Sequence, residues 1–163
     1  MTLIPKGIVV HSMSEYIEYE GEVLYAKDFL KKIGLSVHGF ITVDGKYDKM
    51  LPTTEKAAHA GQSVWGDYKG LNSSFIGFEI LVKGINDYPT FLRKIQGKDA
   101  YSELQFYCAV EIVKWWMKEY NISSNNVIRH SDCSGDAVRG VGQGKKDPGA
   151  GFDWELFKKE ISK

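Results

Sequence analysis

Near its C-terminal end the chain carries a histidine, a lysine and an aspartate that could form a metal centre. A short β-branched run at residues 127–129 leads to His130, and a glycine-rich segment then brings the chain to Lys145 and Asp147. Imidazole and carboxylate are ligand types that zinc prefers, and a nearby lysine can stabilise developing negative charge. Taken alone, a histidine at a strand end more often makes an ordinary hydrogen bond, so the interpretation depends on the rest of the chain.

A second histidine follows a similar apolar run near the N-terminus. Residues 7–11 read Gly-Ile-Val-Val-His and predict a buried strand that ends at His11. Adjacent strands of one sheet can place His11 and His130 at the same edge, where the glycine-rich loop can add Asp147. Three protein ligands leave a fourth position open for water, which is the catalytic form of a zinc site. The spacing is only suggestive, because the ligands are scattered and the chain has no HExxH or CxxC motif.

A third feature is a carboxylate inside an apolar strand. Residues 75–82 form a nearly continuous apolar run that predicts a central strand, and Glu79 interrupts it. A carboxylate in such a run is rarely buried unless it is paired or functional. Glu79 is therefore the most informative single charge in the sequence.

Other segments predict the elements that must position these side chains. Helical spacing predicts an amphipathic helix over residues 20–33, ended by Gly34, and a long helix over residues 101–120. Residues 12–14 are expected to form a loop. A second loop, residues 57–72, carries His59, Trp65 and Asn72, which suit sugar or peptide recognition; a loop packed by its own aromatics is the alternative.

Composition narrows the classes of function. The 163 residues predict one domain spanning 1–163 and, by default, a monomer. Lys+Arg and Asp+Glu are both 21, and this balance argues against a nucleic-acid or anionic-membrane partner. The sequence shows neither a membrane span nor a signal peptide, so we expect a cytoplasmic protein that could leave the cell by lysis or a dedicated secretion route. Cys108 and Cys133 do not form a disulfide framework.

Several short motifs occur in one order over residues 7–154, nearly the whole chain. They are Ile8–Ser12, His38–Ile41 before Asp44-Gly45, His59-Ala60-Gly61, Asn72 leading to Ile76–Glu79, His130–Asp132, Lys145–Gly149 and Phe152–Trp154. Each is weak alone, but the ordered set resembles the zinc-dependent N-acetylmuramoyl-L-alanine amidases. That family includes amidase-type phage lysozymes, cytoplasmic anhydromuropeptide amidases and peptidoglycan recognition proteins.

The resemblance implies a fold, a reaction and a set of roles. It implies hydrolysis of the amide between N-acetylmuramic acid and L-alanine, in peptidoglycan or in soluble muropeptides. His11, His130 and Asp147 would bind Zn²⁺, and Lys145 would contact the scissile carbonyl oxygen. Glu79 stands where the cytoplasmic branch carries a glutamate, so we take it as the general base; the tyrosine of the other branches is replaced by Val37. We expect a mixed α/β fold, with one central sheet of five or six strands, helices on both faces and the zinc at one sheet edge.

Some alternatives stay open. The segment from His130 to Asp147 is longer than is usual in the family, and it could reshape the cleft or act as a lid. Within it, Cys133 could compete with Asp147 as a ligand, although the Asp-Pro-Gly context favours Asp147, and Lys146 could replace Lys145. A non-catalytic peptidoglycan-binding module of the same fold is the alternative function. A phage endolysin or secreted toxin would be another use of the same enzyme.

Overall fold

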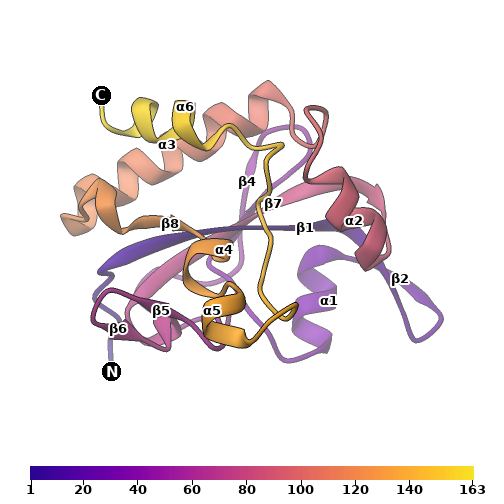
Figure 1. Cartoon of the computed structure of the whole chain (residues 1–163), viewed down its shortest axis with the longest axis horizontal. Helices are drawn as coiled ribbons and strands as arrows, with labels where there is room; N and C mark the ends of the chain where they lie inside the picture. The colour runs from indigo at the N-terminus through magenta and orange to yellow at the C-terminus, as the bar shows by residue number, and fades with distance from the viewer.

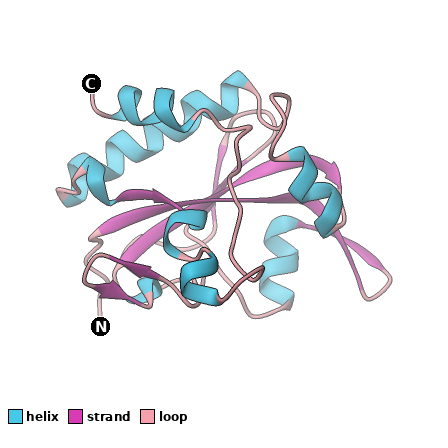
Figure 2. Ribbon diagram, viewed as in Figure 1, coloured by secondary structure: helices cyan, strands magenta, loops and turns pink.

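The computed structural model describes all 163 residues and places a six-stranded mixed sheet between helices on its two faces (Figures 1 and 2). The strand order is β2-β1-β7-β3-β4, and β8 also pairs with β1. Strands β1, β3, β7 and β8 are parallel, whereas β2 and β4 are antiparallel to their neighbours. The strands are β1 (Gly7–Tyr19), β2 (Glu22–Tyr25), β3 (Gly39–Ile41), β4 (Tyr47–Lys49), β7 (Phe75–Ile85) and β8 (Val127–Arg129). The mixed α/β sheet is thus confirmed.

One face of the sheet is covered by two C-terminal helices, α3 (Glu103–Tyr120) and α6 (Trp154–Ile161). Helix α3 starts at a capping box, in which Ser102 and Gln105 satisfy each other's backbone N–H groups. Side chains alternate along a strand, so every second residue of β1 and β7 faces these helices. The resulting main core includes Ile8, Val10, Ile76, Phe78, Ile80, Val113, Trp116 and Phe157.

The opposite face carries shorter elements and two smaller apolar clusters. Helix α1 (Ala26–Lys32) packs on Phe40 and Leu81. The short helix α4 (His130–Cys133) contributes to the other cluster, which also contains Val9 and Ile128. The remaining elements are α2 (Tyr88–Lys94), α5 (Asp136–Arg139), the hairpin β5 (Val64–Trp65) and β6 (Tyr68–Lys69), and the 3₁₀ turns η1 (Leu71–Ser73) and η2 (Ser124–Asn126). No helix is both long and apolar enough to cross a membrane.

Two local predictions are wrong. Residues 12–14 are not a loop, because β1 continues without a break past His11 to Tyr19. The predicted helix over residues 20–33 begins only at Ala26. Glu20 and Gly21 both have positive φ and close a tight hairpin between β1 and β2. Two-residue hairpin turns favour positive φ at both central residues, because this matches the twist of the strands.

The unexpected length of β1 creates the place for a site. On one side β1 pairs with β7 along most of its length. On the other side β8 pairs only with residues 8–10 and β2 only with residues 16–19. The outer edge of β1 is therefore free of strand partners over residues 11–15. Backbone groups in this window are available to bind side chains from elsewhere in the chain.

Candidate metal centre and catalytic cleft

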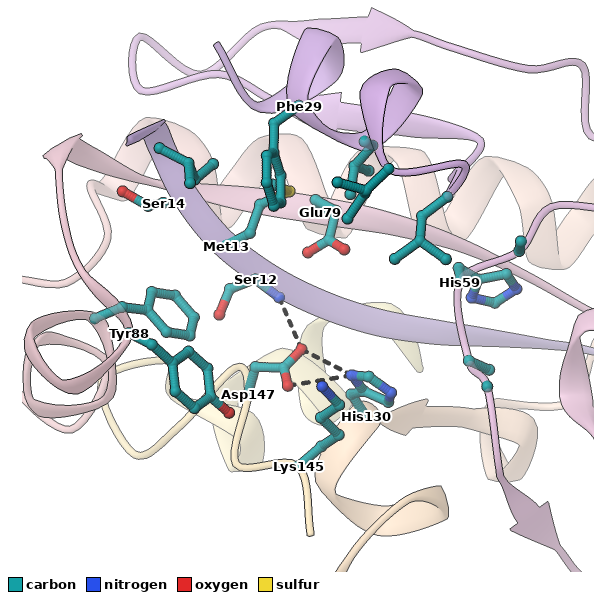
Figure 3. Close-up of a pocket in the computed structure, with 18 of the residues that line it drawn as sticks. Ser12, Met13, Ser14, Phe29, His59, Glu79, Tyr88, His130, Lys145 and Asp147 are labelled. Atoms are coloured by element: carbon teal, nitrogen blue, oxygen red, sulfur yellow. Dashed lines mark hydrogen bonds and ion pairs between the residues drawn. The ribbon is translucent and has the colours of Figure 1, made fainter. Parts of the chain in front are cut away.

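His11, His130 and Asp147 come together at the open stretch of β1; Figure 3 shows His130 and Asp147 of this cluster, with Asp147 hydrogen-bonded to Ser12 of β1. One ligand atom from each lies within 4.8 Å of the others, and all three residues are buried. His130 Nδ1 lies 3.1 Å from both Asp147 carboxylate oxygens, and His11 Nδ1 lies 3.8 Å from Asp147 Oδ2. Tetrahedral N/O ligands at about 2.0–2.1 Å from an ion are separated by roughly 3.4 Å. The observed spacing fits one small metal ion.

The chain brings Asp147 back to His130 through backbone hydrogen bonds. The Ser131 N–H donates to the Asp147 carbonyl at 3.1 Å, and the Lys145 N–H donates to the Ser134 carbonyl at 2.8 Å. The Asp147 carboxylate also accepts the Ser12 N–H at 3.1 Å, which β1 leaves free at its open edge. These three bonds place the carboxylate beside both histidines, although it lies far from His11 in the sequence.

A third histidine sets the protonation pattern of His11. His59 Nε2 lies 3.0 Å from the Phe75 carbonyl, which can only accept a hydrogen bond, so Nε2 carries the proton. Burial lowers the pKa of His59 to about 3, and the ring is neutral. Its Nδ1, 2.8 Å from His11 Nε2, must then accept a hydrogen from His11. His11 Nδ1 is left with a free lone pair that faces Asp147.

Electrostatics agree with a metal-ligand set. Burial, together with the neighbouring His130, His59 and Lys145, lowers the pKa of His11 well below its usual value. Burial alone would raise the pKa of Asp147, but His130 and the Ser12 N–H outweigh it and lower the pKa. His130 Nε2 is buried without a hydrogen-bond partner. A neutral imidazole and an ionised carboxylate are the forms that bind a metal ion.

Two residues of the metal cluster, His130 and Asp147, line a cleft of about 510 Å³. Lys145 and Glu79 line the same cleft, and Glu79 extends from β7 into it (Figure 3). Burial raises the pKa of Glu79 well above its usual value; the Asp147 charge adds to this effect and the Lys145 charge opposes it. One carboxylate oxygen, Oε2, is buried with no partner. A buried carboxyl group with a raised pKa and a free oxygen is suited to accept and donate a proton during a reaction.

The predicted substrate-binding residues separate into two groups. His59 and Asn72 line the cleft. Asn72 Oδ1 accepts the backbone N–H groups of His59 and Ala60 at 3.0 and 2.7 Å, so it holds that loop in place. Trp65 is absent from the cleft lining; it packs on the cluster around Val9 and donates its indole N–H to Asn126 at 3.2 Å. The alternative reading, a loop packed by its own aromatics, describes Trp65 better.

The two competing residues lie away from the site. Cys133 is fully buried in an apolar cluster, its thiol lies against the His130 carbonyl and Ser134, and it is not part of the metal cluster. Burial raises the pKa of the Cys133 thiol to about 11, which disfavours the thiolate that binds metals. Lys146 is exposed and approaches Asp136 at 3.7 Å, whereas Lys145 lines the cleft.

Sequence reasoning missed two contributors. The Ser12 N–H is a backbone group, and only the pairing of β1 shows that it is free. Tyr88 of α2 lines the cleft, with its hydroxyl on the side of Asp147 (Figure 3). Tyr88 is the first residue of α2, directly after the N-cap Asp87, and it is exposed. Nothing in the local sequence pattern distinguishes it from an ordinary surface tyrosine.

The comparison with known protein families decides the classification. The family of N-acetylmuramoyl-L-alanine amidases matches residues 1–150. The chain belongs to this family. The 1,6-anhydro-N-acetylmuramyl-L-alanine amidase AmpD of Escherichia coli K12 is 27% identical over 131 residues, covering 79% of this chain and 60% of AmpD. The N-acetylmuramoyl-L-alanine amidase AmiD of the same organism is 28% identical over 110 residues, covering 66% of this chain and 35% of AmiD.

Solved structures of the family share the fold. AmpDh3 from Pseudomonas aeruginosa, in complex with an anhydromuramic pentapeptide, has a TM-score of 0.71 at 21% identity and covers 98% of this chain and 61% of its own. AmiD from E. coli, in complex with anhydro-N-acetylmuramic acid-L-Ala-D-γ-Glu-L-Lys, has a TM-score of 0.66 at 20% identity over 98% of this chain and 58% of its own. The match thus covers about three fifths of AmpD and of these two solved chains.

Proposed function

We propose that the protein is a zinc-dependent N-acetylmuramoyl-L-alanine amidase, which hydrolyses the amide between N-acetylmuramic acid and L-alanine. The observation that carries the proposal is a metal cluster, two of whose residues (His130 and Asp147) line the same cleft as Glu79 and Lys145. Membership of the amidase family supports the reaction class. A module that only binds peptidoglycan has no need of a buried carboxylate with an unpartnered oxygen and a raised pKa.

We assign the metal ligands to His11, His130 and Asp147. Two imidazoles and one carboxylate are a ligand set that suits zinc and leaves one coordination position open. When bound there, zinc would polarise the scissile carbonyl and lower the pKa of a water molecule from 15.7 to about 7. The Ser12 N–H and the ring of His59 orient two of the three ligands.

Glu79 and Lys145 supply the remaining chemistry. Glu79 takes the proton of the attacking water and passes it to the nitrogen of L-alanine as the amide bond breaks. The products are the lactyl carboxylate of the muramic acid and a free amine. Lys145 places a positive charge where the carbonyl oxygen becomes negative, a contribution of about 2.7–4 kcal/mol if it equals that of one oxyanion-hole donor.

The test is zinc content and product analysis on the same preparation of the full chain. The AmiD substrate, anhydro-N-acetylmuramic acid-L-Ala-D-γ-Glu-L-Lys, serves as the reference soluble muropeptide, and isolated cell walls serve as the insoluble substrate. We expect one zinc per chain and a new L-alanine amine in the products. Bound zinc without cleavage of either substrate would favour the binding module, and no bound zinc would contradict the ligand assignment.

The role of His59 gives a separate prediction. His59→Leu removes the acceptor for His11 Nε2–H, and we expect zinc affinity to fall by about 10–100-fold. His59→Asn can present its side-chain oxygen near the position of Nδ1, so it should recover much of the loss. Zinc affinity is measured by competition with a chromogenic chelator, and stability by thermal unfolding of the metal-free proteins. If both variants bound zinc as tightly as the wild type, His59 would not orient His11.

Lys145 should influence the pH dependence of the reaction. Its positive charge favours the ionised form of Glu79 and so lowers the Glu79 pKa. Lys145→Gln should therefore raise that pKa and move the acidic limb of kcat/KM to higher pH, in addition to lowering kcat by about 10²–10³-fold. Lys146→Gln removes an exposed charge that faces Asp136 and should change neither. If Lys146→Gln had the larger effect on kcat and on the acidic limb, Lys146 rather than Lys145 would be the lysine that contacts the carbonyl oxygen.

A further inference from the structure

Arg139 stands out among the three arginines of the chain because it has no partner. Arg93 donates to the Thr90 hydroxyl at 3.1 Å, and Arg129 pairs with Asp132 at 2.8 Å. Arg139 makes no side-chain hydrogen bond and no ion pair, yet its side chain lines the cleft that contains the metal cluster. A guanidinium offers five N–H donors in a planar fork that matches a carboxylate. An unpaired guanidinium in a substrate cleft is therefore available to an anionic group of the substrate.

Hydrogen bonds hold the segment that carries Arg139 against the loop at residues 60–62. Gln62 donates its side-chain amide to the Val138 carbonyl at 2.7 Å. The Ser134 hydroxyl lies 3.2 Å from the Ala60 carbonyl and 2.9 Å from the Gln62 carbonyl. Asp136 accepts the N–H groups of Gly142 and Gly144 and so closes the following turn. This segment is a folded part of the cleft wall, and little ordering of its backbone remains for ligand binding.

The guanidinium lies beside a glycine of the loop it packs against. A Cβ atom at Gly61 would stand 3.4 Å from Arg139 Nη1, so no side chain separates the guanidinium from that wall. Gly61 has a φ of +56°, a conformation that glycine adopts without strain. The glycine thus lets the guanidinium lie close against the backbone of this loop.

The cleft thus has two positive side chains with different neighbours. The Lys145 charge acts on His11 and Glu79 at the metal end. The Arg139 charge acts on Tyr88, whose pKa is raised by burial and by Asp147 and lowered by Arg139. Lys145 therefore acts at the metal end, whereas the Arg139 guanidinium lies beside Gly61 in the lining of the same cleft.

We propose that Arg139 binds a free carboxylate of the stem peptide and makes the enzyme selective for peptides that retain it. This inference rests on the proposed function and specifies its substrate class. In the reference muropeptide the glutamate is linked through its γ-carboxyl group, so its α-carboxylate is free. That carboxylate lies two residues from the scissile bond, at most about 7 Å along an extended chain. The terminal carboxylate of the third residue offers the same chemistry at greater distance.

The experiment compares three substrates that differ only in these carboxylates. They are the reference muropeptide, the same compound with the glutamate α-carboxyl converted to an amide, and the same compound with the C-terminal carboxyl converted to an amide. kcat and KM are measured for the wild type, Arg139→Gln, Arg139→Lys and the control Arg93→Gln, which removes an exposed arginine outside the cleft. Thermal unfolding of each variant checks the fold.

We expect the wild type to lose roughly 10- to 100-fold in kcat/KM when the recognised carboxylate is amidated, mostly through KM. On the reference substrate, the kcat/KM of Arg139→Gln should fall to about the value that the wild type has on the amide. This variant should cleave the reference substrate and the amide equally well. Arg139→Lys should be intermediate, because it keeps the charge and loses the fork, and Arg93→Gln should match the wild type. The amide that the wild type discriminates against identifies which carboxylate is bound.

Two results would overturn the inference: an Arg139→Gln enzyme that still discriminates, or one that loses activity equally on all three substrates. If the wild type cleaves neither these three compounds nor isolated cell walls, calorimetric binding of L-Ala-D-γ-Glu-L-Lys and its two amides decides. A preference for the free carboxylate that disappears in Arg139→Gln would uphold carboxylate recognition while the amidase proposal fails. Binding without that preference would overturn both.

Discussion

Glu79→Gln should lower kcat by about 10²–10⁴-fold while the protein keeps its zinc. Glutamine has the size of glutamate but cannot take a proton from water. Glu79 is not part of the metal cluster, so zinc content measured by atomic emission should stay at the wild-type value. KM should change little, because the substitution removes proton transfer and leaves the cleft walls intact.

The same variant should gain stability at alkaline pH when both proteins are metal-free. The folded-state pKa of Glu79 is raised by burial, so folding favours its protonated form. In the wild type this favourable contribution is present below the ordinary glutamate pKa of about 4.3 and is lost as pH rises through the folded-state value. Glutamine has no such dependence. Urea unfolding across pH, compared with that of the wild type, measures the difference.

Glu18→Gln is the matched control, since Glu18 is an exposed carboxylate on the neighbouring strand β1. It should leave kcat, zinc content and the pH dependence of unfolding unchanged. If Glu79→Gln retained wild-type kcat, Glu79 could not be the general base. If it lost zinc together with activity, Glu79 would be acting on the metal site.

Asp147→Asn should weaken zinc binding by at least about 10²-fold and abolish amidase activity at limiting zinc. The effect should exceed the 10–100-fold expected for a residue that only orients a ligand. Asparagine can still accept the Ser12 N–H, so the loop should return to the same position. What is lost is the negative charge beside two histidines, which attracts the cation. Chelator competition gives the zinc affinity, and activity is measured as zinc is titrated back.

Asp132→Asn provides the control for this substitution. Asp132 lies two residues after His130, but its carboxylate pairs with Arg129 and is outside the metal cluster. Zinc affinity in this variant should equal that of the wild type, with any change confined to stability. If Asp147→Asn and Asp132→Asn bound zinc equally well, the carboxylate ligand would have to be reassigned.

Features that depend on local pattern were predictable from the sequence. The apolar run around Glu79 predicted a central strand, and β7 occupies that place in the sheet. Helical spacing predicted a long helix over residues 101–120, and α3 spans Glu103–Tyr120. His11, His130 and Asp147 were predicted as one cluster, and the structure brings them together. Periodicity and residue type report these features because a strand or helix buries one face wherever it packs.

Features that depend on pairing between distant segments were decided only by the tertiary structure. The spacing of Val23, Ala26 and Leu30 suits a helix, but Glu20 and Gly21 turn the chain into a hairpin that the sheet stabilises. His59 was predicted to bind substrate, and its contact with His11 follows from the approach of its loop to strand β1. Trp65 faces an apolar cluster because of its hairpin.

Arg139 shows the limit most clearly. Its residue type and its position in the segment between His130 and Asp147 were visible in the sequence, but its freedom from any carboxylate was not. The sequence by itself determined the chemistry available to this protein: two imidazoles, two carboxylates and a lysine on elements that could be ordered along a sheet. The tertiary structure decided which of these groups touch, which lose their water and which remain unpaired. Hydrogen bonds and burial depend on three-dimensional approach, which no local pattern of residues encodes.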